Sequence, residues 1–183
     1  MNQTEEYVFD AIKTWVWSGF YSLDEVYENI EDILEEDCDE NMSLASEEYQ
    51  KKLEDEKSWP DVTDCDRLNS VFEELNQQGI IAIQNAGYTM SHGFEDVGEE
   101  LNTRNRSQVK GYCFYHGQDI ERAVIGAGVR LAFGDLDNID QKKVEVGEIV
   151  INVLNKHGFE TEWNGTAGTR INVTNLKWQR RMY

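Results

Sequence analysis

Polar residues follow three short apolar segments of the sequence, where they could form a small-molecule site. The segments are Ile80–Ile83, Tyr112–Tyr115 and Val129–Phe133, and each suits a buried strand. If these strands are parallel neighbours, their carboxyl ends meet at one edge of the sheet, where open α/β proteins bind ligands. The candidate pocket residues are Gln84, Asn85, Tyr88, His116, Gln118, Asp119 and Asp135.

Within this set, His116 and Asp119 are the pair that could do acid–base chemistry, because a carboxylate can orient an imidazole as a general base. Cys113 precedes His116 by three residues on the same predicted strand, so their side chains point to opposite faces and do not form a Cys–His dyad. A structural role is the alternative, since Asn85 and Gly87 fit a turn and Asp119 fits the first turn of a helix. The sequence favours this alternative and a protein without catalytic activity.

Motifs for cofactors are missing from the sequence. It has no P-loop, no G-x-S-x-G and no H-E-x-x-H, and its three histidines lack metal-ligand spacing. One weak pattern remains, since five residues match EF-hand positions 1, 3, 5, 7 and 12, but Met42 stands where the sharp turn requires Gly. We therefore predict no cofactor and no metal, and the calcium candidates are Asp37, Asp39, Asn41, Ser43 and Glu48.

The charge of the chain is concentrated in its first third. The formal net charge is -19, from 36 acidic and 17 basic residues. Residues 1–66 hold 21 acids and four lysines, whereas residues 67–183 hold 15 acids and 13 bases. An acidic surface repels phosphate backbones and anionic lipid heads, so we expect neither nucleic acid nor membrane as a partner.

The acidic region predicts a helical surface that is either simply solvated or binds a basic protein. Aromatic side chains beside the acids would supply a binding hot spot. By charge alone, such a face is similar to that of immunity proteins, whose acids occupy the phosphate sites of nuclease toxins. The candidate partner face comprises Trp17, Tyr21, Glu28, Glu31, Asp32, Glu35 and Glu36.

The elements that must position these residues are predicted from periodicity. Helical stripes indicate two helices before residue 35 and a weaker third near residues 47–57, and a capping box at Ser22 and Glu25 begins the second. Helices and strands then alternate, and a hairpin formed by residues 159–163 and 170–173 closes the chain. The link at residues 117–128 is near the minimum length of a parallel crossover, and its failure would make the sheet more mixed.

We therefore predict one domain over residues 1–183, with an acidic helical subregion (1–62) and an α/β unit (63–183). Its class is α/β or α+β, with a mixed, largely parallel sheet of about five strands. The start lacks a signal peptide, no segment has the length of a membrane span, and three distant cysteines indicate no disulfide framework. These features predict a cytoplasmic protein. The sequence does not predict the oligomeric state.

Several blocks of the sequence together resemble a bacterial family of unknown function of about 180 residues. The blocks run in order and span most of the chain: Trp15–Tyr21, Trp59–Leu68, Gly79–Thr89, Gly111–Asp119 and Trp178–Arg181. The resemblance implies a bacterial origin and a single-domain length. It implies no activity, cofactor or site residue.

Overall fold

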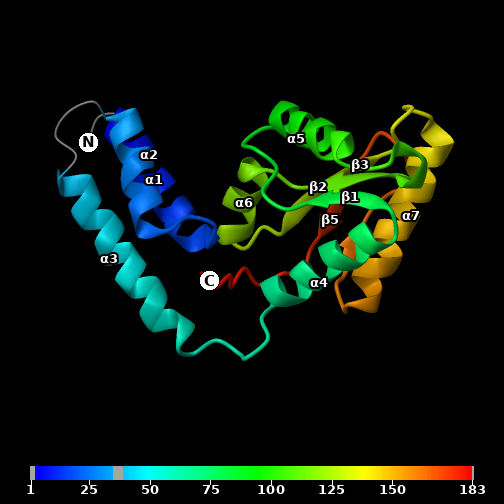
Figure 1. Cartoon of the computed structure of the whole chain (residues 1–183). Helices are drawn as coiled ribbons and strands as arrows, with labels where there is room; N and C mark the ends of the chain where they lie inside the picture. Colours follow the sequence, from blue (N-terminus) through cyan, green and yellow to red (C-terminus); the bar gives the residue numbers. More distant parts are fainter. Residues whose placement is uncertain (1–2, 35–38, 183) are drawn as a thin grey trace. The chain divides into compact units, whose positions relative to one another are not determined.

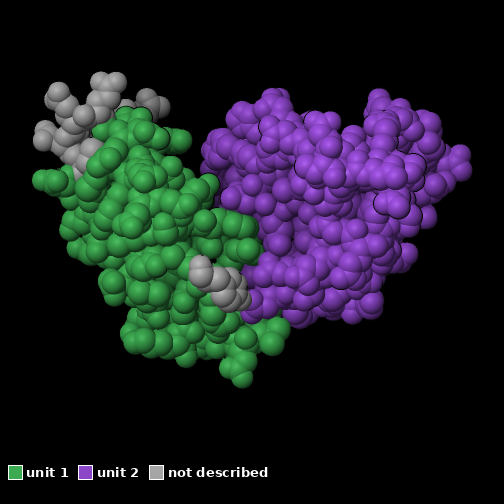
Figure 2. All heavy atoms as spheres, viewed as in Figure 1, with its two compact units in different colours: residues 1–63, 178–183 green, residues 64–177 purple. Residues whose placement is uncertain are grey.

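The computed structural model describes residues 3–34 and 39–182, which form two compact units (Figures 1 and 2). Unit 1 comprises residues 1–63 and 178–183, and unit 2 comprises residues 64–177. The break after Thr63 lies one residue beyond the boundary expected from the sequence. The end of the chain, which the sequence had assigned to the α/β unit, packs instead within unit 1. Within the described ranges, no helix is long and apolar enough to cross a bilayer.

The described residues of unit 1 form three helices that pack on one another: α1 (Gln3–Ser18), α2 (Leu23–Ile33) and α3 (Asp39–Glu56). The predicted capping box begins α2, because the Ser22 hydroxyl accepts from the Glu25 amide and the Glu25 carboxylate accepts from the Ser22 amide. Fully burying a Val or Ile side chain stabilises a fold by roughly 1.5–3 kcal/mol. The core of unit 1 consists of Val8, Ile12, Val16, Val26, Ile30 and Ala45.

Helix α3 begins about eight residues earlier than the sequence predicts. Its first half contains Asn and Ser residues that favour turns over helix interiors, so the pattern there is weak. Packing decides the outcome, since Ala45 is buried in the unit 1 core and Leu44 and Tyr49 pack against that core. Tertiary contacts thus extend a helix that local propensity leaves undefined.

The C-terminal segment completes unit 1. The Trp178 indole donates to the carbonyl of Ser18 at 3.0 Å, and the Arg180 guanidinium lies 4.1 Å from the centre of the Phe20 ring. Arg181 donates to the carbonyl of Pro60 at 2.9 Å. Gly19 has a φ of +73°, and a β-carbon there would collide with the Arg180 backbone. Both arginines of this segment therefore pack against protein groups.

Unit 2 contains a five-stranded sheet in the order β1 (Ile80–Ile83), β2 (Gly111–Phe114), β3 (Val129–Gly134), β5 (Ile171–Val173) and β4 (Thr161–Glu162). Only β1 and β2 are parallel, and the other three neighbouring pairs are antiparallel. The α+β class, the mixed sheet and the closing β4–β5 hairpin are confirmed. The prediction that the sheet is largely parallel is wrong.

The connection between β2 and β3 explains this error. Helix α6 (Gly117–Val124) has only eight residues, and Gly126 and Gly128 follow it with φ near +80° and +71°. These two glycines adopt a conformation that disfavours other residues, and they turn the chain directly into β3. The short link does not carry the chain back across the sheet, so β3 runs antiparallel to β2.

Helices cover both faces of the sheet (Figure 1). Ile81 and Phe114 pack on one face with Val97 of α5 (Met90–Asn102). On the other face, Phe72 of α4 (Asp64–Gln77) meets the ring of Tyr115 edge-on, with centroids 5.4 Å apart. Helix α7 (Asp140–Lys156) packs against β3, and a short 3-10 turn, η1 (Arg106–Gln108), precedes β2. Side chains that alternate along the strands therefore pack into two apolar layers, one on each face of the sheet.

Candidate functional site

Six of the seven predicted pocket residues lie at one end of the sheet. Because β1 and β2 are parallel, with Ile83 opposite Phe114, their carboxyl ends lie side by side. Backbone hydrogen bonds join the two segments that follow β1 and β2. The Ala86 amide donates to the carbonyl of Tyr115, and the Gly117 amide donates to the carbonyl of Gly87, both at 2.9 Å. The residues brought together are Gln84, Asn85, Tyr88, His116, Gln118 and Asp119.

Asp135 is the residue that the structure places elsewhere. The antiparallel register pairs Gly134 with Tyr112, near the start of β2. Asp135 follows Gly134 and therefore lies at the amino ends of β1 and β2, opposite the other six residues. The reversal of β3 separates it from them.

His116 and Asp119 are both buried, with 4% and 1% of their surfaces exposed. The Asp119 carboxylate accepts from the His116 amide at 3.2 Å and forms an ion pair with the Arg170 guanidinium at 2.5 Å. The His116 Nδ1 lies 3.2 Å from Asp119 but has no hydrogen-bond partner among the described atoms. Arg170, which directly precedes β5, also donates to the carbonyl of Arg130. The ion pair between Asp119 and Arg170 therefore joins α6 to the part of the sheet that contains β5.

Burial lowers the pKa of His116 below its ordinary value of 6.5, and the nearby Arg170 charge acts in the same direction. The negative charge of Asp119 opposes this effect without overcoming it. Burial also raises the pKa of the Cys113 thiol to about 12. At neutral pH, His116 is therefore an uncharged imidazole and Cys113 an unreactive thiol.

The remaining residues at this end are held in local contacts. Gln84 accepts from the Tyr115 hydroxyl at 2.9 Å and donates to Asn69 at 3.0 Å, and the Tyr88 hydroxyl donates to Glu121 at 2.7 Å. Asn85 has a φ of +54° within the turn after β1. These contacts support the structural alternative, in which the polar residues close turns and tie α6 to the sheet.

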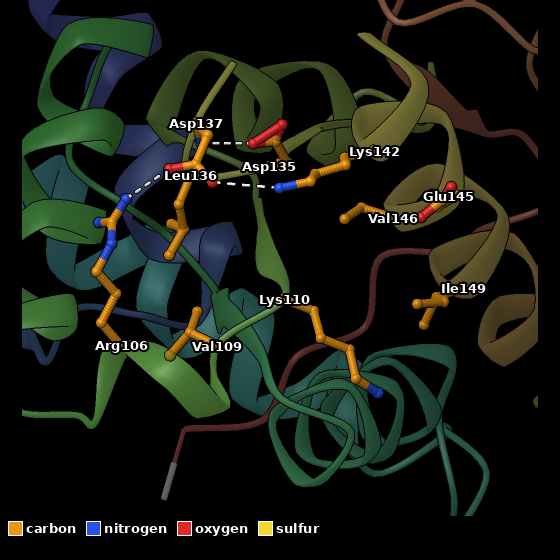
Figure 3. Close-up of a pocket in the computed structure, with 10 residues that line it drawn as sticks. All are labelled: Arg106, Val109, Lys110, Asp135, Leu136, Asp137, Lys142, Glu145, Val146 and Ile149. Atoms are coloured by element: carbon orange, nitrogen blue, oxygen red, sulfur yellow. Dashed lines mark hydrogen bonds and ion pairs between the residues drawn. The ribbon is translucent and has the colours of Figure 1, made fainter. Parts of the chain in front are cut away.

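A hollow of about 320 Å³ lies at the opposite end of the sheet (Figure 3), and we call it the basic hollow after its three cations, which lie alongside three carboxylates. Of the seven predicted pocket residues, only Asp135 lines it. The sequence prediction missed the others, although the basic run from Arg104 to Lys110 just before β2 was a usable signal. The lining residues are Arg106, Val109, Lys110, Asp135, Leu136, Asp137, Lys142, Glu145, Val146 and Ile149.

Hydrogen bonds and ion pairs organise one side of the basic hollow. The buried Asp135 carboxylate accepts from the backbone amides of Asp137 and Ile139, the latter at 2.6 Å. Asp137 lies between two cations, with Arg106 at 2.8 Å and Lys142 at 3.3 Å, as the dashed lines in Figure 3 mark. These two bases hold the pKa of Asp137 below its ordinary range.

A second hollow of about 430 Å³ adjoins the same end of β1 and shares Val109 with the basic hollow. Its cation, Arg104, already binds Glu100 at 2.6 Å and Asn76 at 2.9 Å. Asn76 in turn accepts from the Ala82 amide and donates to the Ala82 carbonyl. Its polar groups serve mainly to join α4, β1 and α5.

The predicted partner face lies in unit 1 and is only partly assembled. Glu28, Glu31 and Asp32 are exposed on α2. Trp17 instead packs against the core of unit 1 and donates to Glu48 at 3.0 Å, and Tyr21 also packs against that core. Glu35 and Glu36 lie outside the described residues. The described part of the face therefore combines exposed acids on α2 with two aromatic side chains that are partly buried against the core.

The four calcium candidates that the structure describes do not surround a common point. Asp39, Asn41, Ser43 and Glu48 all lie on the continuous helix α3, and Asp37 lies outside the described residues. An EF-hand loop must instead fold its ligands around the ion. The Glu48 carboxylate is already bound to Trp17 and Lys51. Among the described residues, no group of three His, Cys, Asp or Glu side chains could hold a metal ion.

The architecture defines an α+β protein with a small mixed sheet and an acidic three-helix unit. The chain belongs to the family described as a domain of unknown function (DUF6891), whose model matches residues 1–182. This agrees with the resemblance to an uncharacterised family of about this length. No curated protein and no solved structure matches the chain significantly.

Proposed function

We propose that this protein is a non-enzymatic binding or regulatory protein of the bacterial cytoplasm, and that its α2 surface binds a basic protein. The observation that carries the proposal is the set of exposed carboxylates Glu28, Glu31 and Asp32 on a helix that contains no basic residue. We call these three residues the α2 acidic face. Among the described residues, no base forms an ion pair with any of them.

The positions of the cations in unit 1 support this proposal. Lys51 pairs with Glu48, Lys57 pairs with Glu54, and the nearly fully buried Lys52 pairs with Glu56, all within α3 or at its end. The arginines of the C-terminal segment lie against Phe20 and Trp59. The remaining lysine, Lys13, lies 4.3 Å from the centre of the Phe9 ring. These contacts engage the bases elsewhere in unit 1, so the local field at the α2 acidic face favours a positively charged partner.

The alternative is a small-ligand binder or enzyme that uses the carboxyl ends of the parallel strands. Its support is weaker, because Gln84, Tyr88 and Asp119 are engaged with other protein groups. His116 is buried and uncharged at neutral pH, so a substrate would have to displace the packing around it before any proton transfer. The α2 acidic face requires no such rearrangement.

The test measures charge-dependent association of the full chain with a basic partner. The immobilised chain captures proteins from a bacterial lysate, and the affinity of each purified basic protein is measured from about 50 to 400 mM salt. The triple variant E28K/E31K/D32K should weaken binding at low salt by about tenfold or more, since each exposed pair contributes roughly 0.2–1 kcal/mol. Lysines near the C-terminus of α2 also suit the helix dipole, so the fold should tolerate them.

The control variant is E73K/E95K/E99K, which reverses three exposed acids of unit 2 and changes the net charge equally. It should retain most of the wild-type affinity. Equal weakening by both variants would mean that binding depends on the net charge of the protein and not on the α2 acidic face. Binding that resists both variants and high salt would refute the proposal.

A further inference from the structure

We propose that the basic hollow binds a small organic dicarboxylate. Its volume of about 320 Å³ lies within the range of small-molecule sites. Three cations from three separate segments line it: Arg106 of η1, Lys110 just before β2, and Lys142 of α7. Carboxylates are the usual partners of Arg and Lys in such sites.

The lining has an apolar part that a hydrocarbon chain can cover. Val109, Val146 and Ile149 belong to it, and Val146 is almost fully buried. A ligand with methylene groups would remove apolar surface from water here, which inorganic anions do not do. The combination of cations and an apolar floor therefore favours an organic acid over phosphate.

Asp137 marks where one ligand carboxylate would bind. Its carboxylate lies between Arg106 and Lys142, and 54% of its side-chain surface is exposed. Exposed ion pairs of this kind contribute little to stability. An external carboxylate can therefore replace Asp137 between the two cations, while Asp137 turns into solvent.

Asp135 is a positioning residue for this arrangement. It is buried, and its two carboxylate oxygens accept from the Asp137 and Ile139 amides. These bonds hold the turn after β3, where Asn138 has a φ of +60°. Because Asp135 holds the backbone of this turn, the side chain of Asp137 can leave the two cations without disturbing the backbone.

Lys110 would bind the second carboxylate. Figure 3 shows its ammonium group directed away from Asp137, at the other side of the lining. No ion pair of Lys110 occurs among the described residues. Glu145 also lines the hollow, and its negative charge disfavours ligands with more than two charges. The site therefore fits a flexible dicarboxylate that extends from Arg106 and Lys142 to Lys110.

The test titrates the full chain with succinate, glutarate and adipate at constant ionic strength and follows backbone amide chemical shifts. Hexanoate and inorganic phosphate serve as comparison probes. We expect saturable shifts around residues 106–110 and 135–149 with at least one dicarboxylate below about 10 mM. That dicarboxylate should bind at least threefold more tightly than hexanoate or phosphate.

Four variants then test the assigned roles. R106Q and K110Q should each weaken the best dicarboxylate by about fivefold or more, because each removes one cation from the site. D137N should tighten binding severalfold, because it removes the competing carboxylate. K177Q, at an exposed lysine outside the hollow, should change nothing.

The D137N result separates this proposal from general damage, because a merely disturbed structure does not bind more tightly. Absence of saturable binding by all three dicarboxylates at 10 mM would overturn the proposal. So would phosphate binding as tight as the best dicarboxylate, or D137N binding no tighter than wild type.

Discussion

The two ends of the central sheet use similar residues in opposite ways. At the carboxyl ends of β1 and β2, Asp119 is buried, and its carboxylate binds the Arg170 guanidinium and the His116 amide at the start of α6. At the amino ends, Asp137 is exposed between Arg106 and Lys142 beside a hollow. An ion-paired carboxylate thus closes one end, whereas at the other end the ion-paired carboxylate is open to exchange with solvent. Burial, rather than residue type, separates a structural ion pair from a candidate binding site.

The largest expected effect is the loss of the buried carboxylate. Asp119→Ala leaves the Arg170 guanidinium without its acidic partner, so the free energy of unfolding should fall by about 3 kcal/mol, as for other broken buried pairs. Urea denaturation measures it. The double variant D119A/R170M should recover part of the loss, because no uncompensated charge remains. A loss no greater than that of Asp137→Ala would contradict the contrast between the two ends.

A smaller effect is expected at Asp135, the buried anchor of the open end. Asp135→Ala removes the acceptor of two backbone amides and should lower the free energy of unfolding by about 1–2 kcal/mol. Urea denaturation again measures the change. Asp135→Asn retains one side-chain acceptor and should lose less. If both variants match wild type, the turn after β3 does not depend on this anchor.

The closed end should also impose a pH dependence through His116. Its pKa is lowered in the folded protein by burial and by Arg170, against the opposing charges of Asp119 and Glu121. The unfolded chain therefore takes up this proton first, near pH 6.5, so stability is full above that pH and is lost as pH falls below it. Unfolding free energies from pH 8 to 5 measure the slope.

The control for this effect is the exposed His92 at the start of α5. His116→Gln should flatten the loss of stability below pH 6.5, whereas His92→Gln should keep the wild-type slope. Equal slopes for wild type and His116→Gln would show that His116 does not titrate differently on folding.

The smallest effect is expected at the rim of the open end. Arg106→Gln and Asp137→Asn alter an exposed ion pair, so their thermal unfolding midpoints should match wild type within error. Differential scanning calorimetry without added ligand measures this. A clear loss of stability in either variant would mean that the ion pair holds the fold, as at the closed end.

The fold was predictable where local patterns are strong. The apolar run Ile80–Ile83 formed β1, and the Ser22–Glu25 capping box began α2 as expected. Prediction failed where the local helical pattern is weak, as at the start of α3, which depends on packing against the unit 1 core. It also failed for the direction of β3, because periodicity reports which residues are apolar and not which way a strand runs.

The candidate site shows the same division. Parallel pairing of β1 and β2 brought Gln84, Tyr88, His116 and Asp119 to one end, as the sequence suggested. The reversed β3 carried Asp135 to the other end. No local pattern could have shown that Arg106 and Lys142, 36 positions apart, would flank one carboxylate.

The sequence by itself determined the uneven charge, the helical first third, the strand segments and the polar residues that follow them. These are properties of composition and of short-range periodicity. Only the tertiary structure decided which polar residues are buried, which lysines and arginines are engaged, and where a hollow remains. Those outcomes depend on the strand pairing of β3 and on contacts between distant segments, which a single short stretch of sequence does not specify.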